Sequence, residues 1–124
     1  MTPMSLDAMA ASIPDGAMIA LPPDNSLPSV ALAKALIRRK ARRLRLVGVP
    51  ISGFATDILI GAGCVEEVQT SAVTLGEAGF APRFSAALKA GQLRILDATC
   101  PAIHTMLQAT EKGVPFMPLR GLIG

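Results

Sequence analysis

Residues 44–71, LRLVGVPISGFATDILIGAGCVEEVQTS, contain two segments of strand length on either side of a short helical segment. The first, 44–49, is mostly apolar and the second, 65–71, alternates in polarity, and the expected helix between them covers 56–60. The helix is expected to end at Gly61-Ala62-Gly63, because glycine readily ends a helix. A strand, a helix and a second strand joined by short loops form a β-α-β unit. Such a unit closes as a right-handed crossover over a parallel sheet.

The same alternation extends in both directions from this stretch. Toward the N-terminus we expect a helix over 5–12 capped by Ser5, a strand over 17–21, and a helix from about 26 with Pro28 in its first turn. Toward the C-terminus we expect a helix over 82–90, a strand over 93–96, a helix over 102–112 and the start of a fifth strand over 114–119. The pattern predicts an α/β fold over 1–124, with an open, mostly parallel sheet and helices on both faces.

The composition agrees with this fold class. Apolar residues make up 51% of the 124 residues and charged residues 17%, which excludes an intrinsically disordered chain. The apolar residues are mainly aliphatic, as in strands buried on both faces of a parallel sheet. No repeat of 20 to 50 residues occurs, which excludes a solenoid.

The net charge of +3 comes mainly from one basic cluster, Arg38, Arg39, Lys40, Arg42, Arg43 and Arg45. Nucleic-acid binding would favour basic residues interleaved with aromatic side chains, and none lies between Leu21 and Gly53. We therefore expect solvated cations that stabilise the end of a helix, and no nucleic-acid partner.

The two cysteines, Cys64 and Cys100, and the single histidine, His104, do not have the spacing of a zinc site, so no metal is expected. Cys100 and His104 lie one helical turn apart and could form a nucleophilic dyad, but a buried, packed Cys100 is the preferred interpretation. Neither a secretory signal nor a membrane-spanning run is present. We expect a cytoplasmic protein with no membrane partner.

Five segments resemble one known family, the family I CoA-transferases, and in particular the A subunits of glutaconate CoA-transferases. Asp15–Leu21 resembles the start of the family signature, and Leu44–Gly48 is similar to the strand DLTLVG. Leu59–Val65 is similar to LIGAGCV and provides the most specific match. Gly76–Phe84 is similar to EGLGLAPRF, and Val114–Arg120 to VPFLPTR. The matches occur in the family's order along nearly the whole chain.

This resemblance implies an A-type subunit of a heteromeric enzyme that moves CoA between carboxylic acids. In the family, a glutamate attacks the thioester, and in two-subunit members this glutamate belongs to the B subunit. No glutamate of this chain lies in the sequence motif that surrounds the family's nucleophilic glutamate. We therefore assign no catalytic residue and expect a B-type partner. The CoA thioester is a substrate, and no further cofactor is expected. Since family A subunits are longer, 1–124 corresponds to the N-terminal part of their domain, apparently truncated at its C-terminus.

Four residues are candidates for substrate binding. Where the family has glycines after the first strand, this chain has Pro22 and Pro23, and proline has no N–H to donate. Asn25 and Ser26 could instead offer side-chain donors at the start of the next helix. The resemblance also points to Glu77 and to Arg120, whose guanidinium would bind a substrate carboxylate.

Two alternatives stay open. The first is a CoA-thioester hydrolase or ring-opening subunit built on the same scaffold. The second is a non-catalytic domain that binds a partner, which the prolines and the missing glutamate would favour. A homo-oligomer is also compatible with the sequence.

Overall fold

The computed structural model describes residues 3–122, which form four parallel strands in the order β1-β2-β3-β4 and five α-helices. The strands are β1 (Met18–Leu21), β2 (Leu44–Gly48), β3 (Val65–Thr70) and β4 (Arg94–Asp97). The α-helices are α1 (Leu6–Ser12), α2 (Val30–Arg38), α3 (Phe54–Gly61), α4 (Pro82–Lys89) and α5 (Cys100–Glu111), and the short 3₁₀ turns are η1 (Asp24–Ser26) and η2 (Gly76–Ala78). The α/β class and the parallel sheet are as the sequence predicts.

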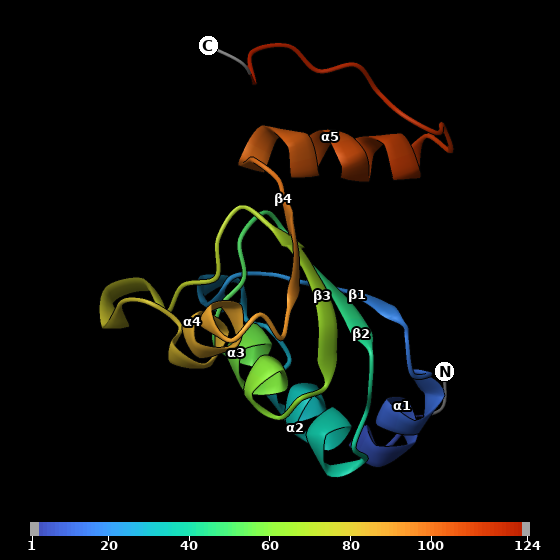
Figure 1. Ribbon diagram of the computed structural model, residues 1–124. Coiled ribbons are helices and arrows are strands. Elements are labelled where there is room, and N and C mark those ends of the chain that lie inside the picture. Colours follow the sequence, from blue (N-terminus) through green and yellow to red (C-terminus); the bar gives the residue numbers. More distant parts are fainter. Residues whose placement is uncertain (1–2, 123–124) are drawn as a thin grey trace.

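Helices cover the sheet on both sides (Figure 1). Because consecutive strands are neighbours and such crossovers are right-handed, α2, α3 and α4 all pack on one face. Helix α5 lies on the other side of the sheet, where Gln69 of β3 donates a hydrogen bond from Nε2 to Met106 Sδ at 3.5 Å. The prediction of helices on both faces is confirmed.

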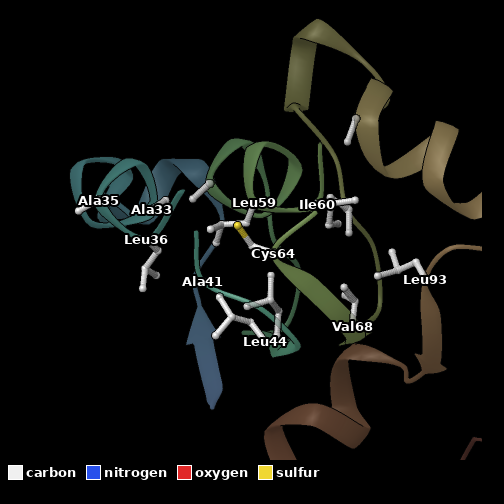
Figure 2. Packing of buried hydrophobic residues seen from close by; sticks show 14 of the residues in the cluster. Ala33, Ala35, Leu36, Ala41, Leu44, Leu59, Ile60, Cys64, Val68 and Leu93 are labelled. Carbon is white, nitrogen blue, oxygen red and sulfur yellow. The ribbon is translucent and has the colours of Figure 1, made fainter. Parts of the chain in front are cut away.

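The main hydrophobic core fills the layer between the sheet and α2, α3 and α4 (Figure 2). Leu44, Leu46 and Val68 point into it from the strands, and Leu59 and Cys64 close it from α3 and the segment that follows. Burial of this kind stabilises a folded chain by about 25 cal/mol for each Å² of apolar surface. A second, thinner layer lies under α5, where Val47, Ala98, Ile103 and Ala109 are buried.

Several expected boundaries are wrong. Helix α2 begins at Val30 with Ser29 as its N-cap, because Leu27 adopts a left-handed conformation (φ 53°) that separates it from η1. Helix α3 begins two residues earlier than expected, at Phe54. Helix α5 begins at Cys100, with Pro101 in its first turn.

The fifth strand expected over 114–119 is absent from the described residues. The segment after α5 is irregular and runs back alongside that helix (Figure 1). Pro115 and Pro118 lack N–H groups, so a ladder through this segment would lose two of its donors.

Candidate functional site

The carboxyl ends of the four strands meet at one edge of the sheet, because all four are parallel. In open α/β sheets, ligands bind in the crevice outside these ends. Four connections converge there, over 22–29, 49–53, 71–81 and 98–99. We call this the carboxyl edge and take it as the candidate site.

The first two connections are joined by Asp24. Its carboxylate accepts the backbone N–H of Phe54 at 2.9 and 3.1 Å, so it caps the first turn of α3. Gly53 makes this approach possible, since a Cβ at that position would collide with the Asp24 carboxylate. Asp24 therefore fixes the loop after β1 against the start of α3, and the sequence analysis missed this role.

Asn25 and Ser26 lie in η1 and are exposed. The Ser26 hydroxyl donates to Asn25 Oδ1 at 3.4 Å. The expectation that they stand at a helix start is wrong, because α2 begins four residues after Ser26. Both side chains remain at the carboxyl edge, where a ligand would meet them.

A polar junction joins the ends of β2 and β3. The carbonyl oxygen of Pro50 accepts hydrogen bonds from Thr70 Oγ1 at 3.2 Å and from Ser71 Oγ at 3.0 Å. Thr70 Oγ1 also lies where a Cβ at Gly48 would stand, so glycine is required there. These contacts hold the ends of β2 and β3 against each other at the carboxyl edge.

The thiol of Cys100 belongs to the same junction. Its sulfur lies 3.2 Å from Ser71 Oγ, and either atom could be the donor. The expectation of a packed Cys100 is wrong: this side chain is exposed, and Cys64 is the buried cysteine. Burial raises the pKa of the Cys64 thiol, which keeps it protonated and unreactive.

The Cys100–His104 dyad does not form among the described residues. His104 is exposed, and the recorded partner of the Cys100 sulfur is Ser71. Ser71 was missed by the sequence analysis. Its position offered a signal, because Ser71 and Cys100 follow two strands that pair in the sheet.

Glu77 and Arg120 occupy different parts of the molecule. Glu77 lies in η2, an exposed turn that projects from the loop after β3 (Figure 1). Arg120 is exposed in the segment after α5, which runs beside that helix. The structure thus brings Asn25, Ser26 and Glu77 to the carboxyl-edge loops and leaves Arg120 on the segment beyond α5.

A buried carboxylate holds the end of the segment Gly76–Phe84. Asp57 of α3 is fully buried, and its Oδ1 accepts the N–H groups of Arg83 and Phe84, both at 2.9 Å. Its Oδ2 accepts Nη1 of Arg83 at 3.0 Å. The Arg83 stem lies against Gly61, where a Cβ would collide with it. These residues therefore hold α3 against α4, and their role is structural.

The Asp15-Gly16 turn is also structural. Asp15 Oδ1 accepts the N–H of Arg42 at 3.0 Å and Nη1 of Arg39 at 3.1 Å. The hydrogen bond from the Arg42 backbone, followed by that from Arg39, lowers the pKa of Asp15. One member of the basic cluster, the half-buried Arg39, therefore pairs with Asp15 at the amino ends of the strands, opposite the candidate site.

Among residues 3–122, no three His, Cys, Asp or Glu side chains gather closely enough to hold a metal ion. No helix in that same range combines the length and the hydrophobicity needed to cross a membrane.

Comparison with known proteins identifies the fold of this chain. No family model matches the chain, and no curated protein matches it. Among solved structures, glutaconate coenzyme A-transferase from Acidaminococcus fermentans matches 98% of this chain with a TM-score of 0.87 at 24% identity. A variant of the decarboxylase AibA/AibB matches 93% with a TM-score of 0.79 at 26% identity. The chain has a CoA-transferase-like fold.

The chain is shorter than these proteins. It covers 39% of the glutaconate CoA-transferase chain and 45% of the AibA/AibB chain. The likeness therefore concerns less than half of each of them. It supports the CoA-transferase-like fold and leaves the choice of subunit open.

Proposed function

We propose that this chain acts as an A-type component of a CoA-transferase that moves CoA between carboxylic acids. The observation that carries the proposal is the match to glutaconate CoA-transferase over 98% of the chain. In this proposal residues 1–124 correspond to the N-terminal part of the A-type domain, and the CoA thioester is a substrate with no additional cofactor.

The residues of the carboxyl edge support a dependence on a partner. Glu77 is the one glutamate in the four connections that form this edge, and it is exposed on η2. An attacking carboxylate must be held against the thioester carbonyl, and an exposed turn does not hold it. In our proposal a B-type chain supplies the nucleophilic glutamate, while Asn25, Ser26, Glu77 and Arg120 bind the substrate.

The decisive experiment is co-expression with the B-type chain, followed by incubation with a panel of acyl-CoAs and free acids. Transfer produces a new acyl-CoA from the added acid. Hydrolysis instead releases the free CoA thiol, and decarboxylation releases carbon dioxide. A new acyl-CoA is the expected product. Free thiol without a new thioester would replace the proposal by the hydrolase alternative.

A non-catalytic role is the second candidate, and the loop after β1 favours it. Pro22 and Pro23 offer no N–H groups, and the N–H of Phe54 beside the loop already donates to the Asp24 carboxylate. This loop therefore presents few free donors to an oxyanion. A complex that forms with a partner and gives none of the three products would establish this second role.

A further inference from the structure

We draw no further inference here: the strongest candidate, the exposed Cys100 thiol at the start of α5 beside the Ser71 hydroxyl at the carboxyl edge, is a lone cysteine, and no second feature of the described residues points to a ligand at that place.

Discussion

The Asp57 carboxylate connects two helices through three hydrogen bonds, although its side chain is fully buried. A buried charge is tolerated only when its acceptor positions are filled by good donors. Here two N–H groups at the start of α4 and one guanidinium provide them. The short stretch from Asp57 to Gly61 thus contains both the buried carboxylate that holds α4 and the glycine that leaves room for the Arg83 side chain.

Asp57→Asn should lower the free energy of unfolding by about 2–3 kcal/mol. The amide has no charge to pair with Arg83, and it has one oxygen fewer to accept hydrogen bonds. Chemical denaturation with urea measures the change. Asp7→Asn is the matched control: Asp7 pairs with Arg38 at 2.8 Å on the surface, and its loss should cost less than about 1 kcal/mol. Equal effects of the two changes would contradict the anchoring role of Asp57.

Asp15 should make stability depend on acidity. Its pKa in the folded chain lies below the usual 3.8, so its ionised form stabilises the fold above that value. This contribution is lost as the pH falls through the lower, folded-state pKa. Asp15→Asn should therefore lower the thermal midpoint at pH 7, and its difference from the unchanged protein should shrink toward pH 2–3, by the same linkage. A difference that stays constant with pH would contradict this.

Arg120 offers a test of substrate binding. In the proposed complex with a B-type chain, Arg120→Lys should raise the KM for the proposed acid substrate about tenfold to a hundredfold, since a lysine does not reproduce the two-pronged geometry of a guanidinium. Steady-state kinetics provides the measurement. The thermal midpoint of the variant should not change, because Arg120 is exposed. Unchanged kinetics would remove Arg120 from the proposed substrate-binding residues.

At the scale of single elements, α5 is the helix that covers the second face of the sheet. It is held there largely by Ile103, which is fully buried, and by the hydrogen bond between Gln69 and Met106. Its first residue, Cys100, brings the thiol to Ser71 at the end of β3. Packing on one face of the sheet is thus connected to the geometry of the carboxyl edge.

Ile103→Ala should lower the free energy of unfolding by about 2–4 kcal/mol, because it leaves a cavity under α5. Leu107→Ala on the same helix is the control, since Leu107 is 36% exposed and should cost less. Urea denaturation measures both. Hydrogen exchange in α5 should rise more in the Ile103 variant than in the Leu107 variant, and the reverse order would show that α5 is held in another way.

At the scale of the whole molecule, the isolated chain should not transfer CoA. None of its glutamates lies within the carboxyl edge except the exposed Glu77, so the covalent step has no positioned nucleophile. An exchange assay between two acids and an acyl-CoA, with the purified chain alone, makes the measurement. Rapid exchange that disappears in Glu77→Gln would show that the nucleophile belongs to this chain after all.

The alternation of apolar runs and helical segments was enough to predict the four strands and their parallel pairing. This succeeds because buried parallel strands tend to be apolar runs: Ile19–Leu21 is one, and Leu44–Gly48 is apolar apart from the exposed Arg45. The helix starts were less predictable. Helix α2 starts late because Leu27 adopts a left-handed conformation, and α3 starts early because Asp24, thirty residues before Phe54, caps it. Neither cause is visible in a local window of sequence.

The candidate site was predicted only in outline. The positions that follow strands reach the carboxyl edge, as Asn25, Ser26 and Glu77 do. The exposure of Cys100 and its contact with Ser71 depend on how α5 crosses the sheet, and no pattern within the helix fixes that. The prediction of a fifth strand did not take into account Pro115 and Pro118, which interrupt the ladder of backbone hydrogen bonds that a strand needs.

The sequential strand order also governs how the chain folds during synthesis. Each strand pairs with the one made just before it, so no strand in residues 3–122 needs a partner from a distant part of the chain. As synthesis proceeds, β2 and β3 each become enclosed when the next strand arrives. Within residues 3–122, β1 and β4 are the two strands that keep an outer edge. This part of the sheet therefore grows in one direction, from β1 toward β4, in the order in which the strands are made.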